Sequence, residues 1–405
     1  MRERIRVLVV DDSVVVRRIV TDVLASDPEI EVVGTAPNGK IALEKIQQLK
    51  PHAVTLDIEM PVMDGLQTIR EIRRVDRRLP VVMFSTLTER GAGATLEALS
   101  SGASDYVTKP ANVGSVAESM ESVRAQLIPK IKALVPGAAE PHAPHAGHAA
   151  HAPVAAHAPA RTPAPAHPAA PVAVRPRTGG VGTPRALVIG CSTGGPEALS
   201  SVLSRVPATI GVPVLVTQHM PPVFTRLYAQ RLDKVSPLTV VEAADGQAVE
   251  AGTVYVAPGD FHMEVVRRGT ALVVKLNQGP PENFCRPAVD VMFRSALATF
   301  GGDLLALVLT GMGSDGKLGC KAIAAAGGQV VVQDEATSVV WGMPGAVARE
   351  GVADEVLPLN AIPDALLRRL GGGGGRGGPP PAPPPPPPPP PPTTPPPAPP
   401  PPPPP

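Results

Sequence analysis

Arg185-Ala-Leu-Val-Ile-Gly-Cys-Ser-Thr-Gly-Gly-Pro196 decides the fold of the C-terminal half of this chain. The apolar first part predicts a buried strand, the glycines predict a tight turn, and the residues after Pro196 recur at helical spacing. Strand, turn and helix are the setting of a Gly-x-Ser-x-Gly elbow, which Gly190, Ser192 and Gly194 satisfy. We therefore expect Ser192 above the sheet at a helix N-terminus, where backbone N–H groups can stabilise an oxyanion.

Two other interpretations of this turn are weaker. A phosphate- or dinucleotide-binding loop needs the Lys-Ser/Thr of a Walker loop or the pattern G-x-G-x-x-G, and both are absent. Cys191 could also be the nucleophile, but the central residue of an elbow faces outward while its neighbour turns toward the fold. Cys191 is therefore expected to be packed inside.

A serine nucleophile needs a base, because its hydroxyl is unreactive at neutral pH. The next apolar run, Val212 to Thr217, predicts a strand that ends in Gln-His-Met-Pro-Pro. His219 would then lie on the same rim as Ser192. A single histidine is more often structural, but its place after the strand that follows the elbow favours catalysis.

A carboxylate should orient that imidazole and stabilise its protonated form. The strongest strand pattern of this half, Asp303 to Thr310, leads into Gly-Met-Gly-Ser-Asp-Gly, so Asp315 falls just past a strand end. Asp260 follows an Ala-Pro-Gly turn in what reads as a hairpin-rich insertion, and Asp290 lies in a helical stretch, so both rank behind Asp315. The order Ser, His, Asp differs from the Ser, Asp, His order of α/β-hydrolases, which makes an ordinary lipase or esterase less suitable.

The N-terminal half alternates short apolar strands with helical patterns. Five such strands alternating with helices imply a parallel, doubly wound sheet. The expected strands lie at 6–10, 32–33, 53–56, 81–84 and 105–107.

Polar residues fall at the ends of these strands, and strand ends of a parallel sheet meet at one edge. Asp11, Asp12 and Asp57 would repel one another there unless a hard cation such as Mg²⁺ accepts their oxygens. Lys109 could pair with a carboxylate or a phosphoryl oxygen, and Ser85 offers a hydroxyl. Any single acid of this kind is more often a solvated loop residue, but the whole set at successive strand ends favours a functional site.

Three motifs in this half, Val-Asp-Asp-Ser, Leu-Asp-Ile-Glu-Met-Pro-Val-Met-Asp-Gly and Tyr-Val-Thr-Lys-Pro, resemble those of two-component receiver domains across about 1–125. The resemblance implies a flavodoxin-like fold, Asp57 as phospho-acceptor, and Mg²⁺ held by Asp11, Asp12 and Asp57. It also implies that Lys109 contacts the phosphoryl group and that Ser85 and Tyr106 are the switch pair.

The C-terminal half, residues 185–360, is similar to the catalytic domain of the chemotaxis protein-glutamate methylesterase and protein-glutamine glutaminase family, CheB. The matching words include Gly-Cys-Ser-Thr-Gly-Gly-Pro-Glu-Ala, Gln-His-Met-Pro and Leu-Thr-Gly-Met-Gly-Ser-Asp-Gly. The resemblance implies Ser192 as nucleophile, His219 as base and then acid, Asp315 as orienting carboxylate, and an oxyanion hole from the backbone of Thr193 and Met312. It implies hydrolysis of glutamyl methyl esters on chemoreceptors, deamidation of receptor glutamines, no cofactor for the ester chemistry, and control by a chemotaxis histidine kinase.

Composition limits the remaining possibilities. A formal net charge of +1 and 2% aromatic residues argue against nucleic-acid binding. Three cysteines without CxxC pairs argue against a disulfide framework or zinc cage. No apolar run is long enough for a signal peptide or membrane span, so we expect a cytoplasmic protein without membrane insertion, and a monomer.

These observations predict a receiver at 1–130, an Ala/Pro/His-rich linker at 131–183, a doubly wound α/β methylesterase domain at 184–370 and a Gly/Pro-rich tail at 371–405. The linker and tail are too biased in composition to form a core. We interpret the histidines of the linker as part of a spacer and not as a metal site, because the segment lacks the structure that would hold them in place as ligands. These histidines are His142, His145, His148, His151, His157 and His167. Two other functions remain open, a non-enzymatic output module and a hydrolase of small esters.

Overall fold

The computed structural model describes residues 3–109, 116–135, 174–175 and 182–371. The predicted linker histidines and nearly all of the tail lie outside these residues. Among the described helices, none combines the length and apolarity needed to cross a membrane.

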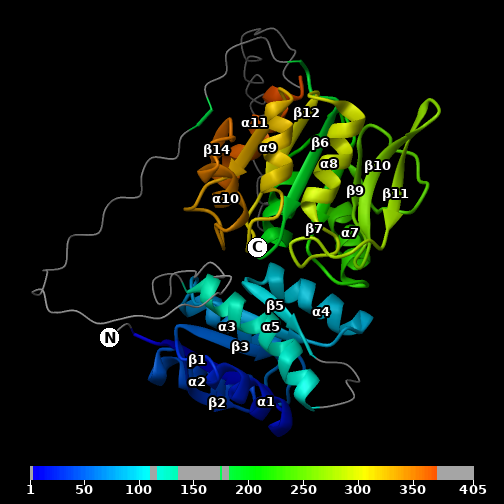
Figure 1. Cartoon of the computed structure of the whole chain (residues 1–405). Helices are drawn as coiled ribbons and strands as arrows, with labels where there is room; N and C mark the ends of the chain where they lie inside the picture. Colours follow the sequence, from blue (N-terminus) through cyan, green and yellow to red (C-terminus); the bar gives the residue numbers. More distant parts are fainter. Residues whose placement is uncertain (1–2, 110–115, 136–173, 176–181, 372–405) are drawn as a thin grey trace, which may run out of the picture. The chain divides into compact units, whose positions relative to one another are not determined.

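The N-terminal part is a five-stranded parallel sheet with the order β2-β1-β3-β4-β5. Helix α1 packs against α5, whereas α2, α3 and α4 contact one another in succession (Figure 1). The strands are β1 Ile5–Val10, β2 Ile30–Ala36, β3 Ala53–Asp57, β4 Val81–Ser85 and β5 Asp105–Thr108, and the helices are α1 Val14–Ala25, α2 Gly39–Leu49, α3 Gly65–Val75, α4 Glu89–Ser100 and α5 Val116–Leu134. This order is that of flavodoxin-like folds, and the chain changes direction between β1 and β3.

The C-terminal part is a seven-stranded parallel sheet with the order β14-β13-β12-β6-β7-β9-β8, and an antiparallel hairpin of β10 and β11 lies beside it. The strands are β6 Ala186–Cys191, β7 Val214–Gln218, β8 Thr239–Glu242, β9 Thr253–Val256, β10 His262–Arg268, β11 Ala271–Asn277, β12 Leu304–Val308, β13 Gln329–Gln333 and β14 Glu355–Leu357. The helices are α6 Gly195–Leu203, α7 Phe224–Val235, α8 Val289–Phe300, α9 Lys317–Ala325, α10 Met343–Arg349, η1 Leu359–Ala361 and α11 Ile362–Arg369.

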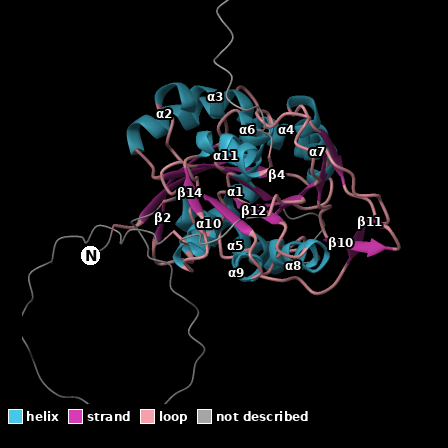
Figure 2. Cartoon of the chain, turned by 90° about the horizontal axis from the view of Figure 1, so that it is seen from above, coloured by secondary structure: helices cyan, strands magenta, loops and turns pink. Residues whose placement is uncertain are grey.

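Helices cover both faces of this second sheet. Helices α6, α7 and α11 lie on one side of the strands, and α8, α9 and α10 lie on the other (Figure 2). From β6 the chain first proceeds to β7 and later returns to form β12 on the other side of β6. The carboxyl ends of β6 and β12 therefore flank the switch point where open α/β sheets bind ligands. The predicted fold class is confirmed for both halves.

Candidate active site and acidic cluster

Three carboxylates meet at the carboxyl edge of the first sheet. Asp11 and Asp12 follow β1, and Asp57 ends β3. One oxygen from each lies within 4.8 Å of the others, and Asp11 and Asp57 are buried while Asp12 is exposed. Oxygen-only ligands at this spacing, one of them open to solvent, suit a hard divalent cation such as Mg²⁺.

Lys109 neutralises part of this charge. Its Nζ lies 2.8 Å from Asp57 Oδ1 and 3.0 Å from Asp11 Oδ2. Burial raises the pKa of Asp57 to about 6, although the hydrogen bond from Lys109 opposes that rise. Asp11 Oδ2 is buried and, despite the nearby ammonium, accepts no aligned hydrogen bond. A buried carboxylate oxygen without a hydrogen bond fits the lone-pair demand of a bound cation.

The expected switch residues lie on β4 and β5 and face other groups. The hydroxyl of Ser85 bonds within its own neighbourhood, accepting from Thr95 Oγ1 at 2.6 Å and donating to the Gly91 carbonyl at 3.1 Å. The ring of Tyr106 is buried and stacks on Phe224 at the start of α7, with 4.8 Å between centroids and 6° between planes. The two side chains are thus held by different partners.

The expected elbow forms between β6 and α6. The backbone N–H of Ser192 donates to the carbonyl of Thr310 at 3.1 Å, and its carbonyl accepts from Gly195 at 2.7 Å, which closes the turn. Gly194 adopts a φ of +75°, a left-handed conformation that favours glycine. Cys191 is fully buried, as the elbow predicts, and burial raises the pKa of its thiol well above the ordinary value.

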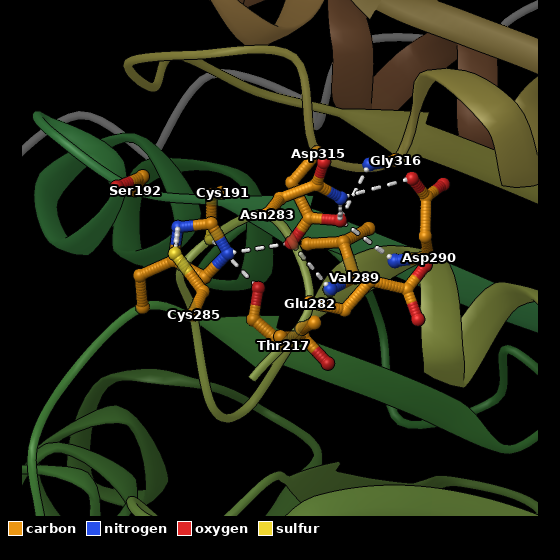
Figure 3. Close-up of polar contacts among 12 residues, drawn as sticks. Cys191, Ser192, Thr217, Glu282, Asn283, Cys285, Val289, Asp290, Asp315 and Gly316 are labelled. Carbon is orange, nitrogen blue, oxygen red and sulfur yellow. Dashed lines mark hydrogen bonds and ion pairs between the residues drawn. The ribbon is translucent and has the colours of Figure 1, made fainter. Parts of the chain in front are cut away.

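His219 follows β7 and bonds to Asp315. Its Nε2 lies 2.8 Å from Asp315 Oδ2. The remaining donors to this carboxylate come from three backbone N–H groups and one side-chain amide (Figure 3). They are Val289 N at 2.7 Å on Oδ2, and Asp290 N at 3.0 Å, Asn283 Nδ2 at 2.9 Å and Gly316 N at 2.9 Å on Oδ1. Burial opposes ionisation of Asp315, yet these bonds and His219 together hold its pKa below the ordinary value.

Asp315 and Asp290 also cap each other's helices. The first two N–H groups of α8, on Val289 and Asp290, donate to Asp315, which precedes α9. In return Asp290 Oδ1 accepts the N–H of Gly319 in the first turn of α9 at 2.7 Å. Neither helix has a capping side chain at its own N-cap residue, so each depends on the other's carboxylate.

The two rival carboxylates have other partners. Asp260 pairs with Arg286, whose Nη2 lies 2.5 Å from Asp260 Oδ1. Asp290 bonds to Gly319 and to Asn283. In the described part of the chain, Asp315 is the carboxylate that bonds to His219.

The second nitrogen of the imidazole has an unexpected neighbour. His219 Nδ1 lies 3.5 Å from the Sγ of Cys285, and among the described residues Ser192 makes no hydrogen bond to His219. In Figure 3, Ser192 and Cys285 lie apart from each other, and no dashed line reaches Ser192. Burial opposes protonation of His219, but its hydrogen bonds to Asp315 and Cys285 outweigh this and raise the pKa of His219 above its usual value of 6.5. A change in the side-chain conformation of Ser192 or of His219 is therefore needed before the hydroxyl can donate its proton to Nδ1.

The expected oxyanion-hole groups are positioned beside the elbow. No hydrogen bond within the described ranges uses the backbone N–H of Thr193 or Met312, as is required of donors reserved for an oxyanion. An added Cβ on Gly311, next to Met312, would lie 3.0 Å from the backbone nitrogen of Ser192. The segment after β12 therefore packs directly on the elbow.

Three contacts of this site carry no signal in the sequence. Cys285 reaches His219, Asn283 reaches Asp315, and the Thr193 hydroxyl donates to Asp105 Oδ2 at 2.5 Å. These partners are between 32 and 88 positions apart. Spacing of this kind follows no helix or strand period.

Comparisons with known proteins match both halves. The response regulator receiver domain family matches residues 7–121, and the CheB methylesterase family matches residues 187–366. A Nocardioides protein named protein-glutamate methylesterase/protein-glutamine glutaminase is 57% identical over 366 residues, which cover 90% of this chain and 95% of the relative. A protein of the same name from Trichodesmium erythraeum is 46% identical and covers 91% of this chain and 99% of the relative.

A solved structure matches part of the chain. The CheB methylesterase catalytic domain of Thermotoga maritima is 43% identical, with a TM-score of 0.45, and the match covers 46% of this chain and 98% of that one. The two full-length relatives align with nearly their whole length at well above 30% identity. The chain therefore belongs to the CheB family of protein-glutamate methylesterases/protein-glutamine glutaminases.

Proposed function

We propose that this protein hydrolyses glutamyl methyl esters on the cytoplasmic helices of chemoreceptors and releases methanol. The observation that carries the proposal is the His219–Asp315 pair at the same sheet edge as the elbow residue Ser192. The names of the full-length relatives support this substrate class.

In the proposed reaction the Ser192 oxygen attacks the ester carbonyl while His219 Nδ1 takes the hydroxyl proton. The tetrahedral oxyanion accepts hydrogen bonds from the backbone N–H groups of Thr193 and Met312. The imidazolium then donates its proton to the leaving methoxide, so methanol departs and an acyl-enzyme remains. Water, deprotonated by the same imidazole, hydrolyses that ester and restores Ser192.

A glutamine side chain can enter the same cycle. The Ser192 oxygen attacks the carbonyl carbon of the amide, and His219 protonates the leaving nitrogen, so that ammonia departs instead of methanol. Both substrates give glutamate after hydrolysis of the same acyl-enzyme. We therefore include deamidation of receptor glutamines in the proposed function.

The first domain is proposed to accept a phosphoryl group on Asp57 from a chemotaxis histidine kinase. Asp11, Asp12 and Asp57 would hold Mg²⁺, which neutralises phosphoryl oxygens when bound. Lys109, already 2.8 Å from Asp57, would pair with a phosphoryl oxygen. Ser85 and Tyr106, on the neighbouring strands β4 and β5, are the proposed switch pair, which would respond to the roughly 1.5 to 2 negative charges that a phosphoryl group adds at Asp57.

We further propose that the unphosphorylated receiver restrains the catalytic site by occlusion. Two contacts support this. Asp105 on β5 accepts the hydroxyl hydrogen of Thr193, which adjoins the nucleophile, and Tyr106 stacks on Phe224. Movement of Tyr106 upon phosphorylation would break the stack and loosen the Asp105–Thr193 bond beside it.

Methanol release from methylated receptor, with and without acetyl phosphate, tests the proposal with the full chain. We expect Ser192→Ala to abolish release, whereas Ser201→Ala, on the exposed side of α6, keeps it. Acetyl phosphate should stimulate the wild type but not Asp57→Asn. Absence of Ser192-dependent release would favour a non-enzymatic output module. Release from small esters that receptor does not inhibit would favour a small-ester hydrolase.

A further inference from the structure

The two nitrogens of His219 are engaged by different groups. Nε2 bonds to Asp315, which leaves Nδ1 as the nitrogen that can receive a proton from Ser192. In the structure Nδ1 instead faces the sulfur of Cys285 at 3.5 Å. The half-buried thiol therefore occupies the position that a catalytic hydroxyl needs.

A tight turn places this thiol. Glu282 and Cys285 exchange backbone hydrogen bonds of 3.0 and 2.9 Å across Asn283 and Phe284. Both central residues have left-handed φ values, +52° and +62°, as a two-residue hairpin turn of the primed type requires. Asn283 Nδ2 also donates to Asp315, so the turn is attached to the histidine–aspartate pair at two points.

We propose that Cys285 is a positioning residue that competes with Ser192 for Nδ1 and thereby holds His219 in a resting orientation in which Ser192 is not bonded to it. This inference rests on the proposed ester hydrolysis, because it concerns the base of that reaction.

The competition does not depend on where the shared proton lies. If the thiol donates to a neutral imidazole, its S–H occupies the lone pair that Ser192 needs. If the imidazolium donates to a thiolate, no lone pair is available. A hydrogen bond to sulfur is weak, so substrate binding can break it and release the imidazole.

The charged groups around His219 define the expected effect on pH dependence. Asp315 and Cys285 face the imidazole directly, and Asp290 lies behind Asp315 through the shared amide of Asn283. Burial lowers the pKa of His219, while Asp315 and then Cys285 raise it. Removal of the thiol should therefore lower the pKa of His219. At any pH below the wild-type pKa, a larger fraction of the His219 side chains is then neutral and able to accept a proton.

The experiment compares Cys285→Ala with the wild type in methanol release from methylated receptor across pH. We expect the acid-side midpoint of kcat/KM to move to lower pH, since this limb reports the free enzyme's base. Below both midpoints the variant should be faster by roughly tenfold for each pH unit of that shift. Cys320→Ala is the matched control, because it removes a fully buried thiol on α9 and should leave the midpoint unchanged.

A second readout separates positioning from structure. NMR titration of the His219 ring in Ser192→Ala and in Ser192→Ala/Cys285→Ala should give a lower pKa in the double variant. An unchanged or higher pKa, or loss of activity at every pH with an unmoved midpoint, overturns the inference. Residual activity of Ser192→Ala would instead overturn the proposed function, whatever Cys285→Ala does.

Discussion

Replacement of Asp315 by Asn tests the core of the proposed site. The carboxylate accepts hydrogen bonds on both oxygens, and Oδ2 receives His219 Nε2 at 2.8 Å and Val289 N at 2.7 Å. An amide offers one acceptor oxygen. The three donors on Oδ1 favour keeping that oxygen there, so the NH₂ group would face His219 and Val289. It would then donate to Nε2 and place the imidazole proton on Nδ1, which is the wrong tautomer for a base that must accept there.

The expected magnitudes follow from this geometry. The variant loses two hydrogen bonds to a charged acceptor, each contributing about 1.5–3 kcal/mol, and regains a neutral one from the amide to Nε2. The free energy of unfolding should therefore fall by about 2–4 kcal/mol. We expect kcat to fall by about 10³–10⁴-fold, because the tautomer is wrong. The folded pKa of Asp315 lies below its unfolded value of 3.8, so the stability it contributes is present above that value and is lost as pH falls. The variant should therefore lose less stability on acidification than the wild type.

The matched control is Asp290→Asn. Asp290 accepts Gly319 N, and thus caps α9, but makes no bond to His219 in the described structure. It should cost about 1 kcal/mol of stability while kcat stays within about tenfold of the wild type. Urea unfolding and methanol release measure both quantities. The reasoning is refuted if Asp290→Asn reduces kcat as strongly as Asp315→Asn, or if Asp315→Asn retains a tenth of wild-type kcat.

Three further changes have defined outcomes. Without Mg²⁺, Asp57→Asn should raise the melting temperature, because it removes a carboxylate whose burial raises its pKa to about 6. Added Mg²⁺ should raise the melting temperature of this variant less than that of the wild type. A lower melting temperature of the variant without Mg²⁺ would contradict this reasoning. Asp105→Ala should raise methanol release by the unphosphorylated chain because the contact with Thr193 is lost, and unchanged release would count against occlusion through that contact. Gly311→Ala places a Cβ in steric overlap with the sulfur of Met343 and 3.0 Å from Ser192, so methanol release should fall at least tenfold and the melting temperature should fall as well; full activity would show that the elbow tolerates the shift.

The sequence predicted the parts of the site that depend on strand ends. Asp57, Ser192 and His219 were expected after apolar runs, and these runs form β3, β6 and β7. The prediction works because buried parallel strands have continuous apolar stretches and because their carboxyl ends converge at one edge. Their catalytic and phosphoryl roles stay predictions.

The rest depends on contacts that no local pattern encodes. The residues around Asp260 read as a hairpin-rich insertion, and the antiparallel hairpin of β10 and β11 does follow Asp260. The sequence patterns predict neither β8 nor β9, which are parallel and extend the central sheet beside β7. Short apolar runs do not indicate which neighbour a strand will choose. Likewise the proximity of Cys285 to His219 arises from a turn whose residues look like an ordinary loop.

The exchanged caps of α8 and α9 constrain how this domain can be re-engineered or recombined with relatives. If only the segment around Asp315 is transplanted, the first N–H groups of the recipient's α8 must bond to a carboxylate from another protein. If only the segment around Asp290 is transplanted, the same applies to the first turn of the recipient's α9. A chimera should therefore carry 283–290 and 311–319 together as one cassette.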